Sequence, residues 1–150
     1  MNYSVFEVFR IGIGPSSSHT VGPMSAANSF LRELEANGVF GQVRQVRASL
    51  YGSLALTGVG HGTDFAVVAG LMGEVPEDID PVASRDRVDA VRRDQRLPLG
   101  GRHEIDFDRA ADLEMHKAEF FPEHPNGIML EAFDGTDRSL YQNVYFSIGG

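Results

Sequence analysis

The chain has no cysteine among its 150 residues. It can therefore form no disulfide, build no cysteine-ligated zinc site and hold no iron–sulphur cluster through its own thiolates. It also lacks an apolar run of the roughly 18 residues that a membrane span needs, and its first residues lack the basic and apolar regions of a signal peptide. These absences predict a cytoplasmic protein without a membrane partner.

Basic residues are few: 13 lysines and arginines stand against 21 aspartates and glutamates, which gives a formal net charge of −8. A nucleic-acid partner is therefore not expected, because phosphate backbones are bound by basic surfaces. The hydrophobic fraction of 42% and the charged fraction of 23% are those of an ordinary folded protein. At this length we expect one domain, residues 1–150.

Hydrophobic spacing predicts two helices and a strand in the first half of the chain. Apolar residues at i, i+3, i+4 and i+7 indicate an amphipathic helix over about residues 23–36, with Pro23 in its first turn. Branched and aromatic residues favour a strand over roughly 43–51. A short, largely apolar and therefore buried helix is expected to open at Thr63, acting as its N-cap, and to stop at Gly73.

The second half changes character after one more helix. Asp80 followed by Pro81 predicts a capped helix to about Arg93. Its expected apolar stripe is Val82, Val88 and Val91. Strand-like segments and turns then follow at 103–107, 113–120, 124–127, 127–133, 134–135 and 140–148. Helices first and hairpins last predict an α+β fold, in which a mostly antiparallel sheet carries about three helices packed on it.

A glycine- and hydroxyl-rich segment, residues 10–23, leads into the first expected helix. Its candidate functional residues are Ser16, Ser17, Ser18, His19 and Thr20. Free backbone N–H groups and the positive end of the helix dipole at that terminus, together with the hydroxyls, suit a carboxylate or a phosphate. In the alternative interpretation the hydroxyl residues only cap the helix and His19 is a surface residue.

Three glycines surround His61 in the segment 58–64, at the mouth of the second expected helix. Glycine lets the backbone approach a ligand closely, and an imidazole with an intrinsic pKa of about 6.5 can move protons at neutral pH. His61 is therefore a candidate general base. The alternative is a flexible connector in which Thr63 caps the helix and His61 is solvated. No Gly-Lys-Ser/Thr follows the glycines, which excludes a Walker-type phosphate loop.

The segment 124–127 is by itself an ordinary turn, although Asn126 could donate a hydrogen bond to a substrate carboxylate and His124 adds a titrating group. His103 and His116 are expected to be surface residues without a role. A Ser–His hydrolase is disfavoured because no Gly-x-Ser-x-Gly elbow is present. No metal site is predicted, because the histidines lack the HxH or HExxH spacing of metal ligands.

Four stretches follow one another in a characteristic order: 4–24, 50–64, 124–127 and 145–150. In this order they resemble the β part of bacterial iron–sulphur L-serine dehydratases, and the resemblance covers essentially the whole chain. It implies a lyase, L-serine ammonia-lyase, that serves amino-acid degradation and gluconeogenesis. It also implies a fold similar to the allosteric substrate-binding domain of D-3-phosphoglycerate dehydrogenase.

The resemblance implies dehydration of L-serine to aminoacrylate, which tautomerises and hydrolyses to pyruvate and ammonia. A [4Fe–4S] cluster, held by cysteines of a second, α part, would act as a Lewis acid on the β-hydroxyl. This chain lacks that part, so we expect it to bind no cofactor itself and to be inactive alone. Its expected partners are the cluster-bearing part, L-serine and a second copy in a homodimer.

The resemblance also implies roles for the candidate residues. His61 would be the base beside Cα, and His19 a second proton-transfer or hydrogen-bonding group. His124 would be a further member of the site. The carboxylate and amine of serine would be positioned by Ser16, Ser17, Ser18, Thr20, Thr63 and Asn126. The main rival is a regulatory module that binds an amino acid or another small anion.

Overall fold

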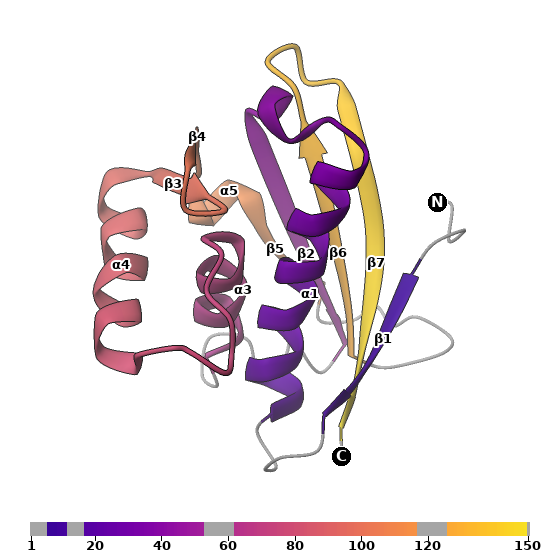
Figure 1. The fold of residues 1–150 in the computed structure, drawn as a ribbon, viewed down its shortest axis with the longest axis vertical. Coiled ribbons are helices and arrows are strands. Elements are labelled where there is room, and N and C mark those ends of the chain that lie inside the picture. Colours follow the sequence, from indigo (N-terminus) through magenta and orange to yellow (C-terminus); the bar gives the residue numbers. More distant parts are fainter. Residues whose placement is uncertain (1–5, 12–16, 53–61, 117–125, 150) are drawn as a thin grey trace.

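The structure is a computed structural model that describes residues 6–11, 17–52, 62–116 and 126–149 (Figure 1). Side chains are described for residues 21–52, 62–116 and 127–146. The elements in chain order are β1 (Phe6–Ile11), α1 (Ser17–Ala36), the 3-10 helix η1 (Phe40–Gln42), β2 (Gln45–Gly52), α3 (Thr63–Leu71), α4 (Pro81–Asp94), β3 (Arg96–Leu99), β4 (His103–Asp106), α5 (Arg109–Asp112), β5 (Leu113–His116), β6 (Asn126–Phe133) and β7 (Ser139–Gly149). The predicted α+β class is confirmed.

Five strands form one mixed sheet in the order β1-β7-β6-β2-β5. β6 pairs antiparallel with both β7 and β2, whereas the edge strands β1 and β5 run parallel to their neighbours. The sheet is thus mixed rather than mostly antiparallel. Parallel neighbours need a long crossover, and the one from β2 to β5 contains α3, α4 and a separate two-stranded sheet of β3 and β4.

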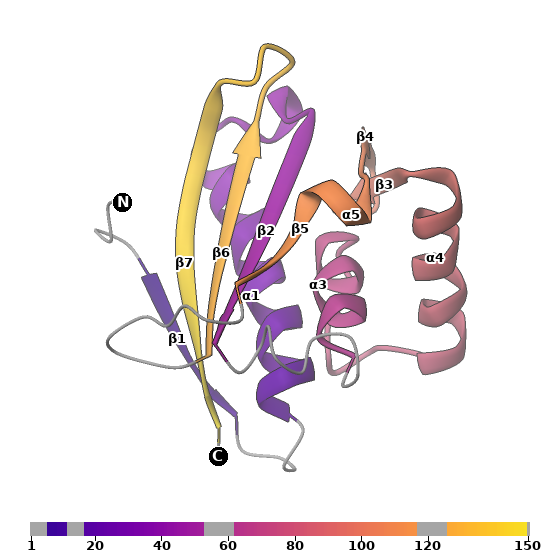
Figure 2. The ribbon, with the colours of Figure 1, turned by 180° about the vertical axis from the view of Figure 1, so that it is seen from behind.

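The three long helices follow one another away from the sheet (Figure 1). α1 packs against β1, β6 and β7, α3 packs against α1, and α4 packs against α3. Of the three, only α1 makes extensive contact with the sheet, which corrects the expectation that about three helices pack directly on it. Seen from behind, no described helix crosses the other face of the sheet (Figure 2).

Helix α1 begins at Ser17, earlier than the start near residue 23 that its hydrophobic pattern predicts. Pro23 therefore lies inside the helix and not in its first turn. Proline has no N–H for the carbonyl four residues earlier, so the helix is continuous there without that hydrogen bond. Ser17, Ser18 and His19, expected in a loop, belong to the first turn of α1 instead, whereas Ser16 lies outside the described residues.

Helix α3 is the short, buried helix expected near Thr63. Its N-cap is Gly62, with a φ of 78°, and Thr63 is its first helical residue instead of the cap. A positive φ of this size is a conformation that favours glycine, which explains why a glycine stands at this position. The predicted stop at Gly73 is confirmed to within two residues, since the helix ends at Leu71.

Helix α4 begins as predicted, with Pro81 as its first residue and the Asp80 side chain accepting hydrogen bonds from two backbone N–H groups of the first turn. Its predicted apolar stripe needs one correction. Val88 and Val91 are buried, but Val82 is 74% exposed. The buried residues of α4 are therefore Ser84, Val88 and Val91, which recur at the spacing of one helix face.

The predicted strands in the second half are confirmed in β4, β6 and β7, and in β5 over Leu113–His116, while residues 117–120 of that predicted strand lie outside the described residues. Two strands, β1 and β3, were not predicted. Asn126 and Gly127 open β6 and are not turn residues. The turn at Asp134 is confirmed, with its carboxylate accepting the Thr136 N–H at 2.8 Å.

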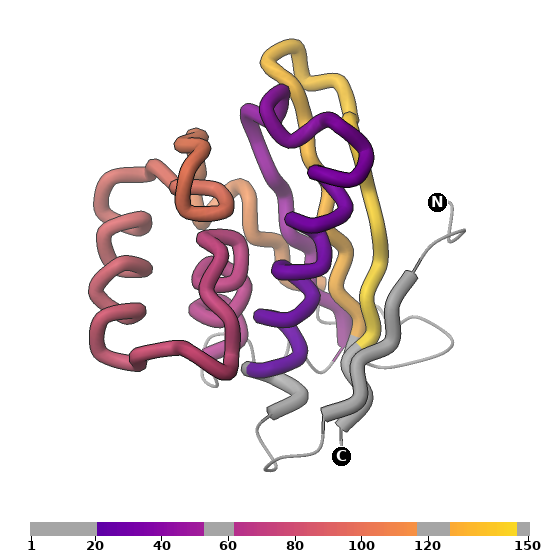
Figure 3. The backbone as a smooth tube through the Cα atoms, in the orientation of Figure 1, coloured from indigo at the N-terminus to yellow at the C-terminus, as the bar shows by residue number. Residues whose placement is uncertain are grey.

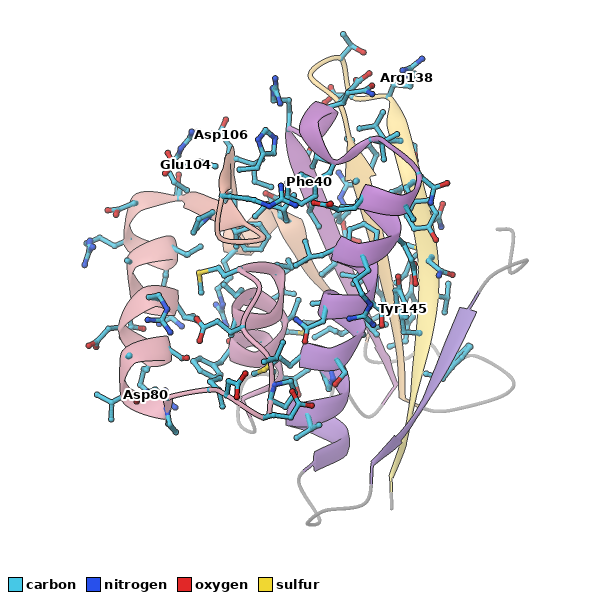
Figure 4. The ribbon with its side chains drawn as sticks, viewed as in Figure 1. Phe40, Asp80, Glu104, Asp106, Arg138 and Tyr145 are labelled. Atoms are coloured by element: carbon cyan, nitrogen blue, oxygen red, sulfur yellow. The ribbon has the colours of Figure 1, made fainter. Side chains whose placement is uncertain are left out.

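A half-buried carboxylate joins α1 to β7. Glu33 Oε1 accepts hydrogen bonds from the Tyr141 hydroxyl at 2.8 Å, the Asn143 amide at 2.9 Å and the Tyr145 hydroxyl at 2.5 Å. The three donors alternate along β7, so they share the face that α1 covers, and Figure 4 shows Tyr145 beside α1. Burial, followed by the hydrogen bond to Glu33, raises the pKa of Tyr145.

Ionisation of tyrosine is expected to limit stability at alkaline pH. In the unfolded chain Tyr145 has a pKa of about 10, and in the folded state its pKa is higher. The stability that the protonated hydroxyl of Tyr145 contributes to the fold is therefore complete below about pH 10 and is lost as the pH rises further. The urea unfolding free energy should therefore decline above about pH 10. Tyr145→Phe should be about 1–2 kcal/mol less stable at neutral pH but should show a shallower alkaline decline. Equal slopes for the two proteins would contradict this account.

Candidate active site

The segments that carry the predicted site residues join the described structure at one end of the fold. β2 ends at Gly52, which pairs with Asn126, the first residue of β6. One residue earlier, Tyr51 pairs with His116, the last residue of β5. Helices α1 and α3 both begin at this same end (Figure 1), and the backbone tube shows α3 in the same position (Figure 3). The flanks of segments 53–61 and 117–125 and the start of α1 are therefore neighbours.

The predicted site residues fall into three groups. Three lie outside the described residues: His61, His124 and Ser16. Four form the first turn of α1, where only their backbone is described: Ser17, Ser18, His19 and Thr20. The last two are Thr63, fully buried as the first residue of α3, and Asn126, which opens β6. The structure brings the described members to one end, and the roles of all nine stay predictions.

The two helix starts at this end differ in charge. The first turn of α1 contains no acidic residue, so its free N–H groups and the positive end of its dipole are not opposed by a carboxylate of that turn. The first turn of α3 contains Asp64, which already supplies the negative charge that a helix start favours. Of the two helix starts, that of α1 is therefore electrostatically the more favourable for an anion.

Asp64 is held from two sides. Its Oδ1 accepts the Phe65 N–H at 2.9 Å, and its Oδ2 accepts a hydrogen bond from Nη2 of Arg109. The Asp64 side chain is 9% exposed and that of Arg109 is 33% exposed. No local pattern in the sequence indicates this pair, because the two residues lie 45 positions apart.

Two aromatic side chains stack on each other at the ends of β2 and β5. The rings of Tyr51 and His116 stack with centroids 4.5 Å apart and an interplanar angle of 10°. His116 Nε2 also lies 3.3 Å from Glu114 Oε1. His116 was expected to be a surface residue, but it is half-buried, because the parallel pairing of β2 with β5 that places it beside Tyr51 was not predicted.

Two cavities differ in place and in character. One of about 190 Å³ lies beside the starts of α1 and α3, and its lining is apolar: Val21, Met24, Phe65, Pro76, Ile79 and Pro81. A larger one of about 450 Å³ is lined by residues of the β3–β4 sheet, α5 and the β6–β7 turn, at the other end of the fold (Figure 1). It contains six aspartates against two arginines. Neither lining suits the carboxylate of an amino acid.

Within the described ranges, no group of three or more histidine, aspartate or glutamate side chains could hold a metal ion. The chain also has no cysteine to supply a thiolate. None of the helices that the structure describes is long and apolar enough to cross a membrane.

The described structure is thus an α+β domain in which the ends of β2 and β5 and the start of β6, which flank the segments 53–61 and 117–125, lie together. The chain belongs to the serine dehydratase beta chain family, whose model matches residues 4–150. The predicted resemblance to L-serine dehydratases is thereby confirmed.

Curated relatives agree with this assignment. The chain is 45% identical over 150 residues to an L-serine dehydratase of Streptomyces coelicolor, a match that covers 100% of the chain and 33% of that protein. It is 44% identical over 149 residues to L-serine dehydratase 1 of Escherichia coli, with 98% of the chain and 32% of that protein covered. An L-serine dehydratase of Mycobacterium tuberculosis is 41% identical, with 100% and 32% covered. The chain spans about a third of the length of these relatives.

Proposed function

We propose that residues 1–150 are the β domain of an iron–sulphur-dependent L-serine dehydratase. The whole enzyme, an L-serine ammonia-lyase, converts L-serine to pyruvate and ammonia. The family match over residues 4–150 carries this proposal. The common end of the fold supports it, since one small substrate must be reached from several segments at once.

His61 removes the α-proton of serine in the proposed reaction. Neutral imidazole is a base of suitable strength near pH 7, and the glycines on both sides of His61 in the sequence allow a substrate to come close to the backbone. His19, in the first turn of α1, is the second proton-transfer or hydrogen-bonding group. His124 completes the set of proposed site histidines.

The substrate carboxylate is proposed to bind at the start of α1, beside Ser17, Ser18 and Thr20. Ser16 precedes this turn, and Thr63 and Asn126 stand at the starts of α3 and β6. A helix start offers N–H donors in a fixed direction. Holding both the carboxylate and the amine fixes the α-proton in front of the base, and such orientation lowers the barrier by several kcal/mol.

The proposed [4Fe–4S] cluster belongs to the remainder of the longer enzyme, because the cysteine-free chain does not fit its ligand set. When bound, the cluster supplies a Lewis acid for the β-hydroxyl that leaves. This chain contributes the base and the groups that orient serine. We further propose a cytoplasmic homodimer and a fold like that of the allosteric substrate-binding domain of D-3-phosphoglycerate dehydrogenase.

An anaerobic assay of the full-length protein with a reconstituted cluster tests the proposal. Incubation with L-serine should form pyruvate and ammonia in equal amounts, whereas the 150-residue chain alone should form neither. D-Serine is the matched control substrate, because it presents the α-proton on the opposite face. Absence of pyruvate at full iron loading would overturn the proposal.

The regulatory alternative gives a different pattern in the same protein. If the chain were a binding module only, His61→Ala would leave kcat at saturating L-serine unchanged. It would instead alter the binding of an amino acid or small anion, measured by calorimetry on the full-length protein. The proposed function requires a loss of kcat.

A further inference from the structure

A partly buried ion pair lies at the start of α3, and the proposed reaction makes no direct use of it. Asp64 is the second residue of the helix, and Arg109 is the first residue of α5. Both carboxylate oxygens of Asp64 are occupied, one by the Phe65 N–H and the other by the guanidinium of Arg109. The pair thus ties two elements that are far apart in the sequence.

Helix capping alone does not explain this arrangement. Asp80 caps α4 from an exposed position, through hydrogen bonds to backbone N–H groups. A capping carboxylate therefore needs no burial. Burying the Asp64 carboxylate costs several kcal/mol that pairing with Arg109 must offset, so such pairs are a poor source of net stability. The pair instead fixes how the start of α3 and the start of α5 lie relative to each other.

The ion pair completes a ring of contacts that connects the described residues on the two sides of the segment 53–61, which carries His61. That segment starts after Gly52, which the ladder with Asn126 holds in place. It ends at Gly62, whose φ of 78° makes the sharp entry into α3. On the other side of the ring, α5 leads directly into β5, which lies parallel to β2. Asp64 and Arg109 are the bond that completes this ring.

The same bond lies next to the second histidine segment. β5 ends at His116, immediately before residues 117–125 with His124. A shift of α5 relative to α3 would therefore move the flanks of both histidine segments. The pair is placed where small displacements have the largest effect on the site.

We propose that Asp64 and Arg109 are positioning residues, which hold the start of α3 against α5 and so fix the loop that presents His61 to the substrate. This inference rests on the proposed function of His61 as the base. It assigns neither residue a contact with the substrate.

The test uses Arg109→Met in the full-length enzyme, followed by amide hydrogen exchange and serine deamination. Exchange in the first turn of α3, at residues 65–67, should become at least tenfold faster, whereas exchange in the middle of α1 should not change. kcat should fall at least about tenfold, because small misplacement of a reacting group is costly. KM should change less than about threefold, since the carboxylate is held at α1. Arg109→Lys should recover part of kcat.

Two further variants complete the design. Asp64→Asn keeps the size and the acceptor for the Phe65 N–H but removes the charge, so it repeats the test if Arg109→Met does not fold. The matched control is Arg93→Met, which breaks the exposed pair of Arg93 with Asp94 at 3.1 Å on α4. This control should leave exchange in α3 and kcat unchanged, because exposed ion pairs contribute little.

The outcomes separate this inference from the proposed function. Normal exchange and normal kcat in Arg109→Met, with an active wild type, would overturn the inference alone. Faster exchange throughout the domain, with equal losses in all steady-state parameters, would also overturn it, because it would show a general structural role. If the wild-type protein does not deaminate L-serine but Arg109→Met still shows faster amide exchange in the first turn of α3 alone, the result would support the ion pair as the contact that holds α3 and would overturn the proposed function.

Discussion

Replacing His61 with alanine in the full-length enzyme is expected to lower kcat for L-serine deamination by at least about a hundredfold, the low end of general-base contributions. Alanine cannot accept the α-proton, and water is a far weaker base at neutral pH. KM should change much less, because other groups hold the carboxylate. The measurement is anaerobic pyruvate formation at saturating serine, made after equal iron content has been established for variant and wild type.

His103→Ala is the matched control for this experiment. His103 Nε2 lies 2.7 Å from the Val43 carbonyl oxygen, and its ring packs beside Phe40 with centroids 5.6 Å apart. These contacts belong to the β4 region and not to the end where α1 and α3 begin. The control should lose some stability and keep kcat. A normal kcat in His61→Ala would move the base assignment to His19 or favour the regulatory alternative.

The elements that could be predicted are those whose signals are local. The cap of α4 at Asp80 and the buried run of α3 were correctly predicted because capping and burial depend on neighbouring residues. Strands β6 and β7 were also found, since each is a long run of branched and aromatic residues. Local chemistry thus gave the fold class and most of its elements.

The features that could not be predicted depend on pairing between distant segments. β1 lies parallel to β7, and its six residues acquire strand character from a partner more than 130 positions away in the register. β5 joins β2 across a crossover whose described part includes α3, α4, the β3–β4 sheet and α5. Nothing local marks such partners. The mixed sheet and the half-buried place of His116 were missed for this reason.

The candidate site residues also divide into those that the local sequence indicates and those that depend on contacts between distant segments. The glycine, serine and histidine segments were proposed from composition and resemblance, because their residue types are informative in themselves, and their roles stay predictions. The ion pair between Asp64 and Arg109 was not found, because either residue alone is an ordinary surface charge. Only the fold brings Arg109 of α5 within reach of Asp64 of α3 and turns the two charges into a partly buried contact.

Gly70 of α3 is expected to be the least replaceable glycine in the described interface of α1 with α3. A Cβ added there would lie 2.7 Å from Ala27 Cβ and 2.7 Å from the backbone oxygen of Met24. Alanine favours a helix over glycine by about 1 kcal/mol, but this clash involves backbone and cannot be relieved by a rotamer change. Gly70→Ala should therefore lower the free energy of unfolding by about 1–3 kcal/mol, and Gly70→Val by more.

Urea unfolding of the 150-residue chain, followed by circular dichroism, measures this loss, and Gly41→Ala is its control. A Cβ at Gly41 would meet nothing within 4 Å, so that variant should stay within about 0.5 kcal/mol of the wild type. A stable Gly70→Ala would mean that α1 and α3 can move apart without cost. In the full-length enzyme Gly70→Ala should also lower kcat, because His19 and Thr63 lie in the first turns of α1 and α3. If the variant is less stable but keeps full kcat, the close packing of α1 against α3 does not affect the reaction at the ends of these helices.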